Sequence, residues 1–190
     1  MTKSITAISM MRRLTFITIM IITFAANAKA GDPKYNINEV TGSFKELAGV
    51  HAFTFAEDWS QITINGMSTS EWLEARQFEQ PEFDAKKELD TELKPAMKEL
   101  RGALVEKLQG EIRFTNEEGP DYKLTITPLS IDKKGNMILQ CTIGRASGGQ
   151  VVKFYVKGKG GTFGSMGNLW GDGFESAGKN LAKILKKNIL

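Results

Sequence analysis

Three segments in which apolar and polar residues alternate most constrain what this chain can fold into. They span residues 122–126, 137–143 and 152–156. A period of two places every second side chain on the same face of a strand, so each segment is predicted to be a strand with one buried and one exposed face. The connections are short, with Gly135 in the first and a Gly-Gly pair at 148–149 in the second, and both suit hairpin turns. The three segments therefore predict an antiparallel meander on which the rest of the domain packs.

Helical periodicity is strongest over residues 82–109. Apolar side chains recur there at steps of three or four, which predicts one long amphipathic helix; they are Leu89, Leu93, Met97, Leu100, Leu104 and Leu108. Pro95 lies inside this stripe and has no backbone N–H, so we expect a kink or a break near Glu92–Lys94. Ser68 and Glu71 have the spacing of a capping box and predict an earlier helix. Asp172 has the same kind of cap spacing and predicts a closing helix over 172–188.

The order of these patterns predicts an α+β fold. Further strands are expected over 50–56 and 61–65, and residues 111–114 are either a short strand or the exit of the long helix. Because strands and helices occur in separate runs, we expect an antiparallel or mixed sheet of about four to six strands with two or three helices packed on one face. The long helix and the closing helix should lie side by side on that face.

The first thirty residues have the pattern of a secretory signal peptide. A basic start is followed by an apolar run over 14–24 and by the small-x-small site Ala28-Lys-Ala30. We therefore expect residues 1–30 to be removed and residues 31–190 to form a single domain. The apolar run is shorter than the roughly 20 residues that a spanning helix needs, so no transmembrane span is expected after cleavage. The alternative is an N-terminal anchor that is never cleaved.

Charge and cysteine content refine the expected location. The chain has 25 Lys and Arg against 22 Asp and Glu, and four of the basic residues and none of the acidic ones lie in residues 1–30. The remainder carries 21 basic against 22 acidic residues, a net charge of −1, which gives no electrostatic basis for a nucleic-acid partner.

Cys141 is the only cysteine and is expected to be a buried, unreactive thiol. A lipid on an N-terminal cysteine is thus excluded, and we expect an exported protein that is periplasmic or outer-membrane-associated but not lipid-anchored.

No motif in the chain predicts catalysis or a cofactor. Gly173–Asn180 nearly matches a phosphate-binding loop, but no strand precedes it and Asn180 replaces the hydroxyl that would bind magnesium. Gly158–Gly164 resembles a dinucleotide fingerprint only loosely and follows a hairpin rather than opening a βαβ unit. His51 is the sole histidine, which excludes a multi-histidine metal site. We therefore predict no catalytic residue, no metal and no cofactor.

A glycine-rich crossing over residues 158–173 connects the last strand to the closing helix. Seven of its sixteen residues are glycine, and four apolar residues punctuate it: Phe163, Met166, Leu169 and Trp170. Apolar side chains exposed on a loop can form a contact surface for a partner, so these four are the predicted binding residues. The alternative is that they tuck under their own domain.

Two blocks of the chain resemble known envelope proteins. The first is the early strand with Asp58-Trp-Ser60 and the following segment up to the Glu71-Trp-Leu73 helix start, and the second is the terminal hairpin, the glycine crossing and Ala177–Leu185. Together they look like small secreted proteins of unknown function from Bacteroidetes. The second block is also loosely similar to envelope lipoproteins of the curli-secretion and TolB N-terminal type. That resemblance implies a sheet with helices on one face and a role in envelope assemblies, but this chain lacks the anchor cysteine of those lipoproteins.

The functional prediction follows from the expected address and from the absence of any coherent set of catalytic residues. We expect a non-enzymatic exported protein that binds a partner protein in the periplasm or at the outer membrane. Two alternatives stay open. One is a hydrolase that acts on envelope material through carboxylates on turns, and the other is a carrier that holds a small ligand between helix and sheet.

Overall fold

The computed structural model describes residues 36–190, so the predicted signal peptide lies outside the described residues. The predicted α+β class is confirmed: helices pack against a mixed sheet of eight strands. The strands are β1 Val40–Gly42, β2 Ala52–Glu57, β3 Thr63–Ile64, β4 Met67–Ser68, β5 Arg113–Thr115, β6 Tyr122–Ile131, β7 Met137–Arg145 and β8 Gln150–Gly158. The expected four to six strands were too few because β1 and β4 are only three and two residues long. Segments of that length carry no recognisable period of two.

The helices include a long closing helix and a segmented central one. They are α2 Thr69–Glu79, α3 Ala85–Glu88, the π-helical turn η2 Leu89–Leu93, α4 Met97–Leu108 and α5 Met166–Ile189, with a short 3₁₀ turn η1 at Lys45–Leu47. The predicted break near Pro95 is confirmed, since α3, η2 and α4 replace one continuous helix. Within residues 36–190, no helix is both long and apolar enough to cross a membrane.

The sheet is built around the predicted meander. Its main strand order is β1-β8-β7-β6-β2-β5, and β6, β7 and β8 pair antiparallel as expected. The sheet is mixed because β2 pairs parallel with both β6 and β5. The register between β6 and β7 shifts between Pro128 and Ser130. Pro128 cannot donate a ladder hydrogen bond, and such residues are found in sheets at bulges.

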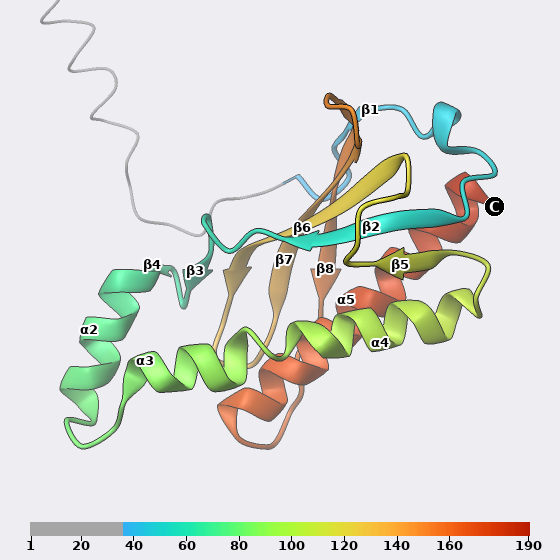
Figure 1. Ribbon diagram of the computed structural model, residues 1–190. Helices are drawn as coiled ribbons and strands as arrows, with labels where there is room; N and C mark the ends of the chain where they lie inside the picture. Colours follow the sequence, from blue (N-terminus) through green and yellow to red (C-terminus); the bar gives the residue numbers. More distant parts are fainter. Residues whose placement is uncertain (1–35) are drawn as a thin grey trace, which may run out of the picture. The chain divides into compact units, whose positions relative to one another are not determined.

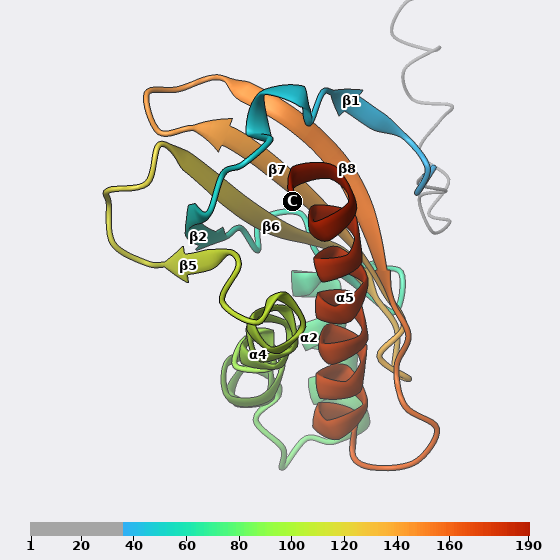
Figure 2. The ribbon, with the colours of Figure 1, turned by 90° about the vertical axis from the view of Figure 1, so that its right-hand side faces the viewer.

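Helices α4 and α5 lie side by side and cover the same face of the sheet (Figure 2). The core fills the space between them and the sheet, with Phe53, Leu124, Leu100 and Phe174 fully buried. Fully burying one such side chain stabilises the fold by roughly 1.5–3 kcal/mol. On the opposite face of the sheet stand polar residues of the alternating pattern that are partly exposed; they include Thr125, Gln140, Thr142 and Lys153.

Helix α5 begins six residues earlier than the predicted start at Asp172. Ser165, rather than Asp172, is its N-cap, and the Ser165 hydroxyl oxygen accepts a hydrogen bond from the backbone N–H of Asn168 at 3.3 Å. Glycine is required at some positions of this helix because neighbouring backbone lies too close for a side chain. A methyl group on Gly173 would lie 2.0 Å from the carbonyl oxygen of Gly135, a distance that no side chain can occupy. The loop between sheet and helix is therefore shorter than the predicted glycine-rich crossing.

Helices α2 and α3 extend away from the sheet (Figure 1). The predicted capping box at the start of α2 is present: the Ser68 oxygen accepts from the Glu71 backbone N–H, and the Glu71 carboxylate accepts from the Ser68 backbone N–H at 2.8 Å. Arg76 joins the two helices through hydrogen bonds of 2.9 and 3.2 Å to the Glu88 carboxylate. The Arg76 guanidinium also lies 5.3 Å from the centre of the Phe83 ring. These contacts hold the two helices together as one projecting arm.

Candidate functional site

A groove of about 640 Å³ lies between the η2–α4 segment and the first turns of α5. The aromatic residue that lines it is Phe163, whose side chain is 89% exposed. Four carboxylates line its walls: Glu92, Glu99, Asp172 and Glu175. We call this feature the acidic groove. It brings together two parts of the chain about seventy residues apart, as the separation of Glu99 and Asp172 shows.

Two glycines of α5 allow its first turns to approach the other wall. A methyl group on Gly167 would lie 2.3 Å from a carboxylate oxygen of Glu92, and one on Gly171 would lie 3.7 Å from the Glu99 side chain. Any larger residue at position 167 would push the Glu92 side chain aside. The glycines that predicted a flexible crossing therefore shape a wall of the groove.

The opposite wall is shaped by Pro95. Because proline has no backbone N–H, the carbonyl oxygen of Thr91 loses its usual helical donor. The chain adapts with a wider turn, in which the Lys94 N–H donates to the carbonyl oxygen of Leu89 at 3.2 Å, five residues back. Both Thr91 and Glu92 line the groove. Single π-helical turns of this kind occur frequently at functional sites.

The charges of the groove are unbalanced. Lys98 is the one basic residue among those that line it, and it lies 3.7 Å from Glu99. Glu175 is paired with Lys179 along α5. Within residues 36–190, Glu92 and Asp172 form no ion pair closer than 4 Å. The groove therefore presents net negative charge, which favours a positively charged ligand or protein surface.

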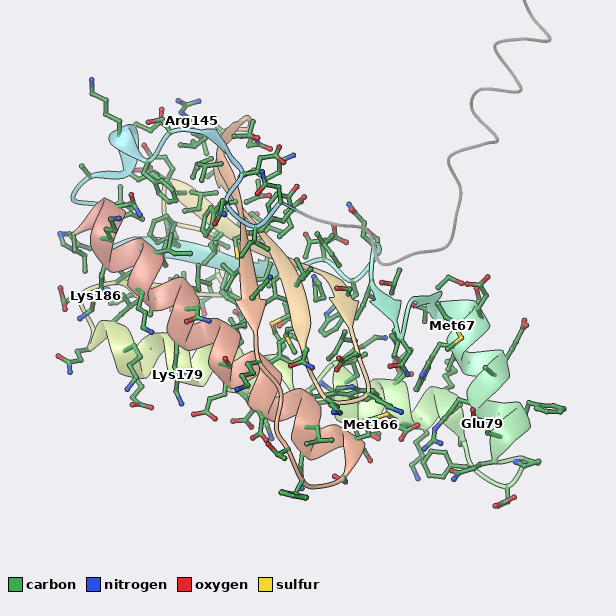
Figure 3. All side chains as sticks on the ribbon, turned by 180° about the vertical axis from the view of Figure 1, so that it is seen from behind. Met67, Glu79, Arg145, Met166, Lys179 and Lys186 are labelled. Atoms are coloured by element: carbon green, nitrogen blue, oxygen red, sulfur yellow. The ribbon has the colours of Figure 1, made fainter. Side chains whose placement is uncertain are left out.

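The four predicted binding residues separate into three environments. Phe163 is almost fully exposed, whereas Met166 and Leu169 are half-buried. Figure 3 shows Met166 at the start of α5, on the side of the α3–η2 segment. Trp170 is fully buried, with its ring centre 6.1 Å from that of Trp72. Interpreting Trp170 as part of an exposed surface was wrong, because the early start of α5 turns this side chain into the core.

The other residues discussed in the sequence analysis lie in places where they form no binding or catalytic site among the described residues. Cys141 is fully buried as expected, and burial raises the pKa of its thiol. His51 is exposed at a strand end, and its Nδ1 lies 2.8 Å from the carbonyl oxygen of Glu111. Gly173–Asn180 lies inside α5, so it forms no phosphate-binding loop. In the part of the chain that the structure describes, no three His, Cys, Asp or Glu side chains are grouped as metal ligands.

The acidic groove was not predicted, although the sequence holds part of its signal. Glu92 and Glu99 are seven residues apart, on either side of the break at Pro95, and Asp172 and Glu175 are three apart on one face of α5. This spacing does not predict which faces of the helices pack against each other. That relation depends on the close packing of α5 against η2 and α4.

Comparisons with known proteins place the chain in no family. No family model matches it, and no curated protein matches it. Among solved structures, it is similar to a PelC dodecamer from Paraburkholderia phytofirmans, with 10% identity and a TM-score of 0.38 over 80% of this chain and 98% of that chain. It is also similar to an uncharacterized protein, with 11% identity and a TM-score of 0.37 over 73% of this chain and 93% of the other. Likeness at this level carries no functional information.

Proposed function

We propose that this protein is exported to the cell envelope and binds a partner protein there through the acidic groove, without catalysing a reaction. The observation that carries the proposal is the exposure of Phe163 beside a groove walled by four carboxylates. Aromatic residues are enriched at protein interfaces because a large ring gains much from being buried by a partner. An exposed phenylalanine beside a groove is therefore a suitable anchor.

The groove also defines the complementary surface of the partner. An apolar pocket would receive Phe163, and basic side chains would meet Glu92 and Asp172, which have no ion-pair partner among the described residues. Opposite charges across an interface increase the association rate and fix the orientation of the partner. The proposed partner is thus a protein with a basic segment next to an apolar one.

Export is supported by the order of basic, apolar and small residues in positions 1–30. The proposed location is the periplasm or the outer membrane, without a lipid anchor. The resemblance of the two sequence blocks to secreted and envelope proteins agrees with this location. The test is the intact mass of the protein recovered from the envelope fraction. We expect the mass of a chain that begins at Gly31. The mass of a chain that still includes residues 1–30 would contradict cleavage after Ala30.

Partner binding is tested by placing a photo-crosslinking amino acid at position 163 in the native host. The matched control is position 78, because Phe78 is 87% exposed but is not among the residues that line the groove. We expect one discrete crosslinked protein from position 163 and none from position 78. Identical products from both positions would show that any exposed site crosslinks, and would reject the groove as the binding site.

A charge reversal completes the test. Glu92→Lys with Asp172→Lys should reduce the crosslink from position 163, because a basic partner would then meet like charge. The control is Glu117→Lys with Glu118→Lys, which changes the net charge equally at exposed positions between β5 and β6. An undiminished crosslink in the groove variant would show that the carboxylates do not contribute.

A further inference from the structure

The charge of this protein is divided sharply along the chain. Residues 36–121 carry nine basic side chains against eighteen acidic ones, a net charge of −9. Residues 122–190 carry eleven basic side chains against three acidic ones, a net charge of +8. The small net charge of the whole chain therefore hides a strongly basic second half, which contains β6, β7, β8 and α5. Charge asymmetry of this size indicates an interaction with an anionic surface or polymer.

Four lysines of this basic half come together at one end of the sheet. Lys133 and Lys134 lie in the β6–β7 turn, and Lys157 and Lys159 lie at the end of β8. In the β7–β8 register, Lys157 is the partner of Ile138, close to that turn. We call these four residues the lysine cluster.

Two contacts of Gly160 fix the distance between the segments. The Gly160 N–H donates to the side-chain oxygen of Asn136 at 3.3 Å. A methyl group added to Gly160 would lie 1.7 Å from the carbonyl oxygen of Lys134, so the two backbones are in direct contact. The cluster is therefore a property of the fold, since its members come from two separate segments.

The lysine cluster carries charge that the protein does not neutralise. All four lysines are exposed, and none forms an ion pair within residues 36–190. The one carboxylate in the turn, Asp132, accepts hydrogen bonds from the backbone N–H groups of Lys134 and Asn136 and from the Asn136 side chain. Asp132 is thereby held by the turn itself. Four like charges that remain exposed and unpaired create a local positive potential.

We propose that the lysine cluster docks the protein onto an anionic phospholipid surface. Lysine offers a compact charge on a flexible stem, whereas arginine offers a rigid fork for one bidentate ligand. A cluster built only from lysines suits an array of phosphate groups in a plane. Each basic side chain next to an anionic bilayer strengthens the binding, and the attraction falls off within a Debye length.

Docking through the lysine cluster turns the β6–β7 turn and the end of β8 toward the anionic bilayer. The acidic groove shares no residue with the lysine cluster. The lipid proposal does not depend on the proposed function, because vesicle binding and partner crosslinking are measured separately.

The experiment is co-sedimentation of the protein, in the form that accumulates in its host, with vesicles of two compositions. One set contains phosphatidylcholine alone, and the other contains one third phosphatidylglycerol. At about 0.1 M salt we expect binding to the anionic vesicles and little to the neutral ones, and we expect about 0.5 M salt to release the protein. Equal binding to both compositions would overturn the proposal.

A variant pair locates the effect. Changing the four lysines of the cluster to glutamine should weaken binding to anionic vesicles at least about tenfold. The control changes four other exposed, unpaired lysines to glutamine and should retain binding; they are Lys86, Lys87, Lys183 and Lys187. An equal loss in both variants would mean that net charge alone matters and would reject the cluster.

Retention on immobilised dextran sulfate without vesicle binding would assign the cluster to an anionic polymer instead and would reject the lipid surface.

Discussion

The indole Nε1 of Trp170 donates a hydrogen bond to the backbone carbonyl oxygen of Asp132 at 3.2 Å. This bond joins the second turn of α5 to the β6–β7 turn, which carries two members of the lysine cluster. The same turn is fixed from within by the Asp132 carboxylate, which accepts from Asn136. The position of the cluster and the start of α5 are thus set by one small network.

Trp170 is expected to be one of the most sensitive positions of the fold. Trp170→Ala should lower the free energy of unfolding by about 3–5 kcal/mol, because it removes a large, fully buried side chain. Phe163→Ala, at a position that is 89% exposed, should change it by no more than about 0.5 kcal/mol. Urea unfolding followed by circular dichroism measures both. Similar losses in the two variants would show that Phe163 is packed in solution.

Two helical glycines should respond in opposite directions to alanine. Gly178→Ala would place a methyl group 2.3 Å from the carbonyl oxygen of Leu100, so α5 and α4 would have to separate, at a cost of about 1–3 kcal/mol. Gly102 in α4 has open space where its methyl group would lie, so Gly102→Ala should stabilise by about 0.5–1 kcal/mol. Thermal unfolding of the two variants measures the contrast. A stabilised Gly178→Ala would contradict the close helix–helix contact.

The parts of the fold that were predictable from sequence are those with a long, regular pattern. The alternation over 122–156 fixed which side of each meander strand is buried, because one buried face requires a period of two. The apolar stripe of 82–109 and the break at Pro95 were also predictable, since both follow from local backbone chemistry. Two-residue strands such as β4 were not, because they exist only through pairing with a neighbour.

The start of α5 shows why local preference can mislead. Glycine weakens an isolated helix by roughly 1 kcal/mol per residue, so a segment with several glycines predicted a loop. In the folded protein, Gly158 and Gly173 meet, with a methyl group on Gly158 only 2.2 Å from the carbonyl oxygen of Gly173. Once α5 begins at Met166, Trp170 stands four residues before Phe174 and joins the buried stripe of the helix. The burial of Trp170 and the early start of α5 are thus one tertiary effect.

The Arg76–Glu88 pair should control the attachment of α2 to α3. The Glu88 side chain is only 5% exposed, so Arg76→Ala leaves a carboxylate with little access to water. We expect a loss of up to about 3 kcal/mol, the lower end of the range for buried pairs, because Arg76 itself is partly exposed. Lys94→Ala breaks the exposed pair with Asp90 and should have little effect. Hydrogen exchange across α2 and α3 reports the result, and equal protection in both variants would show that the arm is held by other contacts.

The capping box at the start of α2 predicts a dependence on pH. Hydrogen bonds from the side chain and then the backbone of Ser68 lower the pKa of the Glu71 carboxyl. Because the pKa of the folded state is below that of the unfolded chain, this contribution to stability is present above the unfolded pKa and is lost as the pH falls through the folded pKa. The urea midpoint of Ser68→Ala should therefore be lower than that of the native protein, and this difference should be larger at neutral pH than in acid. Carbon-13 NMR titration of Glu71 gives the direct reading: its pKa should rise toward the ordinary value in Ser68→Ala and stay low in Ser70→Ala, a nearby control. An unchanged pKa in Ser68→Ala would assign the shift to another group.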